Sequence, residues 1–452
     1  MAMQKTVVID VVGLSSSLIG DDTPFLKEYI AKRHLQTIQP LLPAVTTSVQ
    51  STYLTGKWPS EHGIVGNGWY DRVDSEIKFW KQSNKLVLAE NIWEKAKREN
   101  PDFTCSQMCW WYNMYSTADF TVTPRPNYLA DGRKLPDCYS KPAELRDRLQ
   151  EKFGQFPLFQ FWGPGADIRS SQWIADAAMY VDDQEDPTLT FIYLPHLDYC
   201  QQKFGPDTAK IGKELREIDA LLKQLVDFYE KKNTQIIILS EYGIAPVKSP
   251  IHINRILRNE GLLQMRVERG LELLDPGESK AFAVADHQVA HVYINDETVK
   301  ERVAAILKNI AGIERVLDRR EQAAHHIDHE RAGDFVLMAD KESWFTYYFW
   351  LDDAKAPDYA RVVDIHKKPG YDPVEMFMSS KLRAAYKLLR KKLGFRYVMD
   401  VIPLDASLVK GSHGSLAVPT EFHPVLITDE LQSDQPLSPV AIHDVIWKHL
   451  MG

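Results

Sequence analysis

The sequence lacks most features that mark secreted, membrane-spanning or nucleic-acid-binding proteins. Its four cysteines, among 452 residues, show neither C-x-x-C spacing nor the density of a disulfide scaffold, so we expect a reducing, cytoplasmic setting. No apolar run approaches about 18 residues, and the first residues form no signal h-region, so we expect neither export nor a membrane partner. The formal net charge of −8 argues against a nucleic-acid polymer as partner, because binding phosphate backbones requires a basic excess.

The sequence does contain enough apolar residues for a large core, since 44% of them are hydrophobic. Its length allows two or three structural units, or one elaborated α/β domain with insertions. Apolar, β-branched runs at 7–12, 188–194 and 235–239 are typical of strands buried on both faces of a parallel sheet. We therefore predict an α/β fold with a mostly parallel central sheet flanked by helices.

Shifts in composition divide the chain into three parts. We expect residues 1–255 to form a core, with an irregular, aromatic covering segment at about 112–180, and residues 256–400 to form an inserted, smaller α/β subdomain. Residues 401–452 would return to the core. No oligomeric state follows from this pattern.

Three helices illustrate the expected local structure. Residues 23–35 have a helical pattern, and Ser438 with Pro439 is typical of a helix start near the C-terminus. Residues 380–393 predict a basic helix, which we interpret as a solvated face, with an anionic partner as the alternative.

Acidic residues occur within or just after three of the predicted strands. Asp10 lies inside 7–12, while Asp198 and Glu241 follow the other two runs. Open α/β sheets bind ligands at the carboxyl ends of their strands. A buried carboxylate is costly unless it is paired or bound to a cation, so these acids are either salt-bridged core residues or metal ligands.

Residues 42–71 contain three hydroxyls, of Thr46, Thr47 and Ser48, where a helix is expected to begin. A helix N-terminus presents backbone N–H groups and a positive dipole end, which suit a phosphate. The alternative is a structural cap followed by a polar loop.

The order of these segments resembles the type I phosphodiesterase/nucleotide pyrophosphatase family of the alkaline phosphatase superfamily. The segments that carry the resemblance are P-A-V-T at 43–46, L-T-G at 54–56, E-H-G-I-V-G-N at 61–67, D-Y-C-Q-Q at 198–202, S-E-Y-G at 240–243 and G-S-H-G at 411–414. They span most of the chain, and the resemblance implies an alkaline-phosphatase-like fold.

The resemblance also implies a catalytic mechanism. Thr46, rather than Thr47, occupies the position of the nucleophile, which would form a phosphothreonine that water then hydrolyses. Asp10, Thr46 and Glu241 would hold one divalent metal ion, and Asp198 and His413 the other. Two zinc ions are common in the family, and some related enzymes use manganese.

The sequence departs from the family at three positions. Gln202 stands where the family has histidine, Glu241-Tyr242 stands where it has Asp-His, and Val49, beside Gln50, occupies the place of a phosphate-binding asparagine. Loss of two imidazoles shifts a zinc site toward oxygen-preferring Mg²⁺, Mn²⁺ or Ca²⁺. We expect Gln50, Gln202 and Tyr242 to contact substrate instead.

Other histidines could replace the missing ligands. His287 and His366 are the better candidates because each follows an aspartate in a short polar break, whereas His196 and His291 are weaker ones. For each of the four, a surface or hydrogen-bonded core histidine is the alternative.

These observations predict a metal-dependent hydrolase that cleaves a phosphodiester or pyrophosphate bond in a small phosphorylated substrate. A nucleotide-like substrate fits the aromatic residues between 110 and 165, which could stack a base. The alternatives are a phosphomonoesterase, a hydrolase of sulfate, phosphonate or sugar-phosphate esters, and a degenerate binding protein without turnover. The substitutions at 49, 202 and 242 motivate the last of these.

Overall fold

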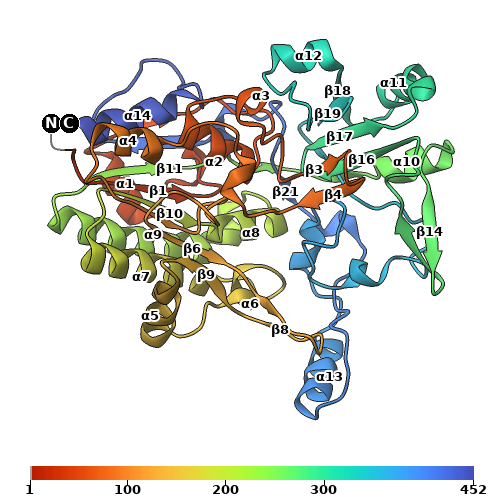
Figure 1. The fold of residues 1–452 in the computed structure, drawn as a ribbon, viewed down its shortest axis with the longest axis horizontal. Helices are drawn as coiled ribbons and strands as arrows, with labels where there is room; N and C mark the ends of the chain where they lie inside the picture. Colours follow the sequence, from red (N-terminus) through yellow and green to blue (C-terminus); the bar gives the residue numbers. More distant parts are fainter. Residues whose placement is uncertain (1–2) are drawn as a thin grey trace.

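The computed structural model describes residues 3–452, and its centre is an eight-stranded sheet in the order β2-β22-β11-β1-β10-β5-β6-β9 (Figure 1). The strands are β1 (Thr6–Val11), β2 (His34–Thr37), β5 (Cys105–Met108), β6 (Phe120–Pro124), β9 (Cys138–Lys141), β10 (Leu189–Leu194), β11 (Gln235–Leu239) and β22 (Val425–Thr428). The five strands from β11 to β6 are parallel, and β22, β2 and β9 are antiparallel to their neighbours. The predicted α/β fold with a mostly parallel sheet is confirmed.

Strand β1 lies in the middle of this sheet and places the first acid. All six of its residues are buried, and Asp10 is in register with Tyr193 of β10 and Leu239 of β11. Because helices cover both faces, the sequence of β1 is apolar throughout except for Thr6 and Asp10.

Helices cover the two faces of the sheet. The helices before residue 240 and at the C-terminus are α1 (Pro24–Ile30), α2 (Thr46–Thr55), α3 (Pro59–His62), α4 (Ile92–Glu99), α5 (Ala143–Phe153), α6 (Leu158–Phe161), α7 (Ile168–Glu185), α8 (His196–Phe204), α9 (Thr208–Lys231) and α14 (Ala441–Met451). Helices α7 and α9 lie on one face, while α2 and α14 lie on the other (Figure 1). Helix α9 packs through a stripe that includes Ile211, Leu215, Ile218 and Leu222.

A second, antiparallel sheet has the order β16-β17-β19-β18 and its own apolar cluster. Its strands are β16 (Ala281–Asp286), β17 (Val289–Ile294), β18 (Ile313–Leu317) and β19 (Phe335–Ala339), and α10 (Ile253–Asn259), α11 (Lys300–Lys308) and α12 (Arg319–Ala324) lie beside it. Two-stranded ribbons are β3 (Gly68–Asp71) with β4 (Glu76–Phe79), β7 (Asn127–Tyr128) with β8 (Lys134–Leu135), β12 (Ala245–Pro246) with β21 (Gly411–Ser412), β13 (Ser249–Ile251) with β20 (Ser343–Phe345), and β14 (Met265–Glu268) with β15 (Leu271–Leu274).

Two predicted helices have different bounds in the structure. The helix expected at 23–35 ends at Ile30, because residues 34–37 pair with β22 as strand β2. The C-terminal helix begins at Ala441, with Val440 rather than Ser438 at its N-cap. The predicted basic helix is α13 (Lys381–Lys392), which lies at one end of the molecule, away from the large sheet (Figure 1). Among residues 3–452, no helix is both long and apolar enough to span a membrane.

Candidate active site

Thr46 is the first residue of α2. Its hydroxyl has a different hydrogen-bond partner from the hydroxyls of Thr47 and Ser48. The Thr47 hydroxyl donates to the Gly66 carbonyl at 2.8 Å, and the Ser48 hydroxyl donates to the Ile64 carbonyl at 2.9 Å. The Thr46 hydroxyl instead lies 3.1 Å from the hydroxyl of Tyr242, on the strand-end side. Thr47 and Ser48 therefore hold the 64–66 loop, while Thr46 faces the acidic residues.

Asp10 and Glu241 form a buried acidic pair beside Thr46. Both Asp10 oxygens and the Oε2 atom of Glu241 have no hydrogen-bond partner among the described residues. Burial, followed by repulsion from Glu241, raises the pKa of Asp10 well above its usual value, and burial also raises the pKa of Glu241. Two adjacent buried carboxylates with three unpartnered oxygens require a shared proton or a cation.

Gln50 holds the outer side of this acidic pair. Its amide nitrogen donates to the Oε1 atom of Glu241, and its carbonyl oxygen accepts a hydrogen bond of 2.6 Å from the Trp111 backbone N–H. Since Gln50 lies one turn after Thr46 on α2, the helix itself orients both side chains toward Glu241.

Asp198 and His413 form a second pair on the opposite side of Tyr242. The Nδ1 atom of His413 bonds the Ala44 carbonyl at 2.7 Å, so Nδ1 carries the proton and the Nε2 lone pair is free. That Nε2 atom lies 3.8 Å from Oδ1 of Asp198, and neither atom has a hydrogen-bond partner within residues 3–452. Burial raises the pKa of Asp198 to about 7 and lowers the pKa of His413 to about 3. Two electron-pair donors therefore face each other across a gap suited to a cation.

Gln202 and four stacked rings support this second pair. Gln202 donates to Asp198 at 2.8 Å, and its carbonyl accepts a hydrogen bond of 2.9 Å from the Tyr371 hydroxyl. The ring of Tyr242 stacks on His413 with centroids 3.6 Å apart, and His287 lies 3.7 Å from His413 and 3.7 Å from Tyr371. The structure thus brings His287 to the cluster, through ring contacts.

Two other histidines lie away from the two acidic pairs. The predicted ligand His366 is exposed on the wall of a cavity, where burial and the charge of Lys134 lower its pKa. His291 bonds the Val65 carbonyl at 3.0 Å and the Gly333 N–H at 3.1 Å. Both of its nitrogens are satisfied, so it is a hydrogen-bonded core histidine.

Asp286 is a site residue that the sequence reasoning did not single out. It is buried at the end of β16 and accepts hydrogen bonds from the backbone N–H of Asn67 at 2.8 Å and from its side-chain amide at 3.1 Å. The side-chain oxygen of Asn67, Oδ1, in turn accepts a hydrogen bond from the Thr47 backbone N–H at 3.2 Å. Burial raises the pKa of Asp286 to about 7. In the sequence, Asp286 ends an apolar run. The same pattern, an acid within or just after an apolar run, identified Asp10, Asp198 and Glu241.

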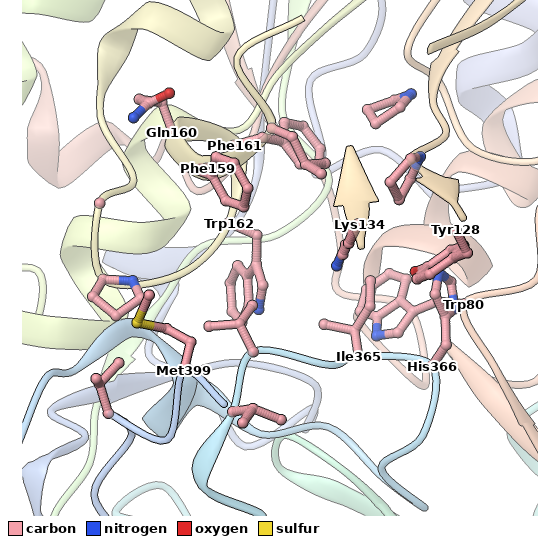
Figure 2. Close-up of a pocket in the computed structure, with 18 of the residues that line it drawn as sticks. Trp80, Tyr128, Lys134, Phe159, Gln160, Phe161, Trp162, Ile365, His366 and Met399 are labelled. Atoms are coloured by element: carbon pink, nitrogen blue, oxygen red, sulfur yellow. The ribbon is translucent and has the colours of Figure 1, made fainter. Parts of the chain in front are cut away.

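A cavity of about 1120 Å³ opens from Thr46 toward the end of the molecule that carries α13. Figure 2 shows the side chains of Phe159, Phe161 and Trp162 on one side and those of Trp80, Tyr128 and His366 on the other. Most of its lining is apolar or aromatic, and Thr46, Asp198, Tyr242 and His287 form its inner end.

The two pairs fit divalent cations only with help from neutral donors. Within residues 3–452, no three His, Cys, Asp or Glu side chains group closely enough to hold a metal ion by themselves. Each pair supplies two such ligands, and the Thr46 hydroxyl is the neutral oxygen nearby. Gln50 and Gln202 face the carboxylates through their amide nitrogens, so either amide would have to turn to offer its oxygen to a cation. A donor set this rich in oxygen fits Mg²⁺ or Mn²⁺ better than a nitrogen-rich zinc site.

This sheet, with its acids at the carboxyl ends of β1, β10 and β11, places the chain in the class of alkaline-phosphatase-like α/β proteins. The sequence profile of the family described as Type I phosphodiesterase / nucleotide pyrophosphatase matches residues 6–372. The chain belongs to that family, whose members are generally metal-dependent. The resemblance seen in the sequence is confirmed.

The curated relatives share only low sequence identity with this chain. An uncharacterised pyrophosphatase/phosphodiesterase of Schizosaccharomyces pombe is 26% identical over 223 residues, which cover 47% of this chain and 39% of the relative. The chain spans less than half the length of the curated relatives it matches.

Two solved structures share the fold over almost the whole chain. A phosphonoacetate hydrolase from Sinorhizobium meliloti, in complex with phosphonoacetate, has a TM-score of 0.64 at 14% identity and covers 99% of this chain and 96% of its own. An inactive Thr-to-Ala variant of murine ectonucleotide pyrophosphatase/phosphodiesterase 5, in complex with AMP, has a TM-score of 0.59 at 16% identity, with 99% and 95% covered. At these identities the likeness concerns the fold alone.

Proposed function

We propose that the protein hydrolyses phosphodiester or pyrophosphate bonds in a small phosphorylated substrate, with Thr46 as nucleophile and two divalent cations as cofactors. The observation that carries the proposal is two buried donor pairs near Thr46, Asp10 with Glu241 and Asp198 with His413. In each pair, atoms that could bind a cation have no hydrogen-bond partner among the described residues. The family's activity supports it, as does the inactive Thr-to-Ala form of the murine relative.

In this proposal the side chains around Thr46 position it for attack on phosphorus. Asp10, Thr46 and Glu241 would hold one cation, and Asp198 and His413 the other, with His287 stacked behind. When bound, such cations stabilise the charge that develops on the attacking and leaving oxygens. The N-terminus of α2 directs its dipole toward the same place, which favours the phosphoryl oxygens.

Tyr242 orients the nucleophile. Its hydroxyl bonds Thr46, and its ring is fixed against His413, so the Thr46 hydroxyl is held between the two donor pairs before substrate arrives. Gln50 and Gln202 tie Glu241 and Asp198 to Trp111 and Tyr371, which keeps both carboxylates in place. We infer that these two amides and Tyr242 also contact the substrate, as the sequence suggests. His366 stays a predicted ligand, although it lies on the cavity wall.

We also propose a cytoplasmic setting, which the four buried, unpaired cysteine thiols support. The alternatives of a monoester or phosphonate substrate, or of binding without turnover, are outcomes of the test that follows.

The test is hydrolysis of bis-p-nitrophenyl phosphate with added Mn²⁺, Mg²⁺ or Zn²⁺. We expect Thr46→Ala to lower kcat by more than about 1,000-fold, because the nucleophile is lost. The matched Thr47→Ala variant should keep most of the activity. Loss of activity in neither variant would contradict the nucleophile assignment. Turnover of p-nitrophenyl phosphate alone would identify a phosphatase, and binding without turnover of either ester would identify a degenerate member.

A further inference from the structure

Residues 381–399, comprising α13 and the turn that follows it, form a projecting arm with an exposed apolar stripe. Leu382, Tyr386, Leu389 and Leu393 are all more than half exposed, and Leu382 is 84% exposed. Their spacing of three and four residues places them on one face of the helix. Monomeric proteins seldom leave such a stripe uncovered, so the outer face of the arm fits a contact surface.

The same arm carries an excess of positive charge. It holds seven cations and no acidic residue, the cations being Lys381, Arg383, Lys387, Arg390, Lys391, Lys392 and Arg396. Among residues 3–452, ion pairs involve only Arg383 and Lys387 of these seven, both with Asp400. Five cations of the arm therefore lack a paired carboxylate among the described residues. Lys391 and Arg396 line the cavity, and the remaining cations, Lys381, Arg390 and Lys392, favour an anionic partner.

The opposite face of α13 belongs to the cavity that leads to Thr46. Ala384 and Leu388, one turn apart, line it together with Phe395 and Met399 of the following turn. Figure 2 shows Met399, Trp162 and Ile365 pointing toward the open middle of this space. At about 1120 Å³ the cavity exceeds the usual range of about 300–1,000 Å³ for small-molecule sites.

We propose that the arm docks on an anionic lipid surface and that the cavity behind it receives the apolar part of an amphipathic phosphate ester. A basic helix with a separate apolar stripe has the composition of helices that lie in the headgroup region of a bilayer. Such a peripheral contact needs no membrane-spanning helix. The second half of the proposal rests on the proposed hydrolase function, because it presents the phosphate of that ester to Thr46.

The exposed apolar stripe favours a lipid surface over a nucleic acid. Phosphate backbones are bound by cations alone, and four exposed large apolar side chains would contribute nothing to that contact. In the headgroup region of a bilayer, both the cations and the apolar stripe of the arm make contacts. The cations contact anionic lipid headgroups, and the apolar stripe inserts at the boundary between headgroups and acyl chains. Because α13 also lines the cavity, the apolar part of a lipid-like ester could pass from the bilayer into the cavity without crossing water.

Docking is tested with the full chain and vesicles of phosphatidylcholine alone or of equal parts phosphatidylcholine and phosphatidylserine. We expect co-sedimentation with the mixed vesicles only, weakening as salt rises. The Arg390→Gln/Lys392→Gln variant should bind about 30-fold more weakly, since each cation near an anionic surface contributes about 1 kcal/mol. The control Lys210→Gln/Lys213→Gln, on α9, should bind like wild type.

The apolar stripe is tested with Leu382→Asp/Leu389→Asp against Leu431→Asp, an equally drastic change at another exposed leucine. Only the first should abolish vesicle binding, while circular dichroism shows both variants folded. Absence of vesicle binding by the wild type would overturn the docking proposal. Binding to an oligonucleotide instead of vesicles would assign the arm to nucleic acid, and concentration-dependent dimers lost in Leu382→Asp/Leu389→Asp would assign it to a second copy of this chain.

The substrate class is tested with p-nitrophenyl alkyl phosphate diesters of increasing chain length, below their micelle concentrations. We expect KM to fall about fourfold per added methylene over the first few, as each buried CH₂ contributes about 0.8 kcal/mol. If no diester is hydrolysed, the proposed function fails. If the short diesters are hydrolysed but KM is independent of chain length, the hydrolase function stands and the lipid-ester assignment of the cavity is wrong.

Discussion

At the scale of single residues, the site depends on which polar atoms are left without partners. The Thr47 and Ser48 hydroxyls donate to carbonyls of the loop that follows α2, and the Asn67 side chain of that loop accepts the Thr47 N–H. Within residues 3–452, the carboxylate oxygens of Asp10 and the Nε2 atom of His413 have no such partner. Other buried polar atoms of the described residues, such as those of Gln107, also lack partners, but two adjacent buried carboxylates with unpartnered oxygens mark the place of a missing positive charge. A proton bound to each pair would also supply that charge. A bound cation and a bound proton must therefore be distinguished by a direct test.

The Asp10→Asn variant provides that test without relying on activity. In the metal-free protein we expect it to raise the melting temperature, because it removes one of two adjacent buried carboxylates. Mn²⁺ at about 100 times its dissociation constant should stabilise wild type by about 2.7 kcal/mol and leave Asp10→Asn unchanged. Asp182→Asn, which replaces a buried acid far from Thr46, should keep the Mn²⁺ response. An equal Mn²⁺ shift in Asp10→Asn would contradict the cation site at this pair.

In the proposed function, the residues at 202 and 242, where the resemblance implies histidine, would set the metal preference. We expect Gln202→His/Tyr242→His to bind zinc more than about 100-fold more tightly than wild type, which exceeds the about 10–100-fold effect of a residue that only orients a ligand. Competition with a chromophoric chelator measures this affinity. Tyr242→Phe, which removes the hydroxyl but adds no imidazole, should leave zinc affinity near that of wild type. Equal zinc affinity in the double variant and in wild type would show that neither position faces the metal.

At the scale of elements, the strands are easier to predict from the sequence than the helix ends. Strand β11 has its predicted bounds, because a buried β-branched run is a strong pattern. The last two residues of the helix predicted at 23–35 belong to strand β2, because pairing with β22, almost 400 residues away in sequence, outweighs local propensity.

A buried acid also joins three elements beneath the large sheet. Asp182 of α7 accepts hydrogen bonds from Thr190 of β10 at 2.9 Å and from Tyr229 of α9 at 2.8 Å. Burial raises the pKa of Asp182 to about 6, above its value in the unfolded chain. Its protonated form is therefore favoured in the folded state, and the stability that it contributes below about pH 4 is lost as the pH rises through 6.

The expected result is that Asp182→Asn gains stability relative to wild type between pH 4 and 7. The gain is about 3 kcal/mol at most, because one pKa unit corresponds to about 1.4 kcal/mol. Urea denaturation of both proteins across this range measures the free energy of unfolding. The exposed neighbour Asp183, changed to Asn as a control, should follow wild type. A constant difference between Asp182→Asn and wild type would contradict the assignment.

At the scale of the whole molecule, the fold and the two acidic pairs could be predicted, but the surroundings of the pairs could not. Asp10, Asp198 and Glu241 carry a local signal, an acid in or after an apolar strand. Tyr371 and Trp111 reach the site from loops whose sequence shows no periodicity, so only the folded chain places them. His366, predicted as a ligand from its position after an aspartate, lies on the cavity wall, and its role as a ligand stays a prediction.

The expected division of the chain at 255 and 400 remains a proposal. The four-stranded sheet of residues 281–339 falls within the predicted insertion, and the return strand β22 completes the large sheet after it. The cavity is lined from 124–165, from 362–401 and from the sheet ends, so the predicted covering segment and the predicted insertion together enclose the approach to Thr46.

The central claim is that Thr46 becomes covalently phosphorylated during turnover. The most direct measurement is peptide mass spectrometry of a reaction with bis-p-nitrophenyl phosphate and Mn²⁺, quenched in acid during the first turnovers. The account predicts a phosphoryl or p-nitrophenyl-phosphoryl adduct on the peptide that contains Thr46, absent in Thr46→Ala and present in Thr47→Ala. Hydrolysis that proceeds with no adduct, or with an adduct on another residue, would contradict it.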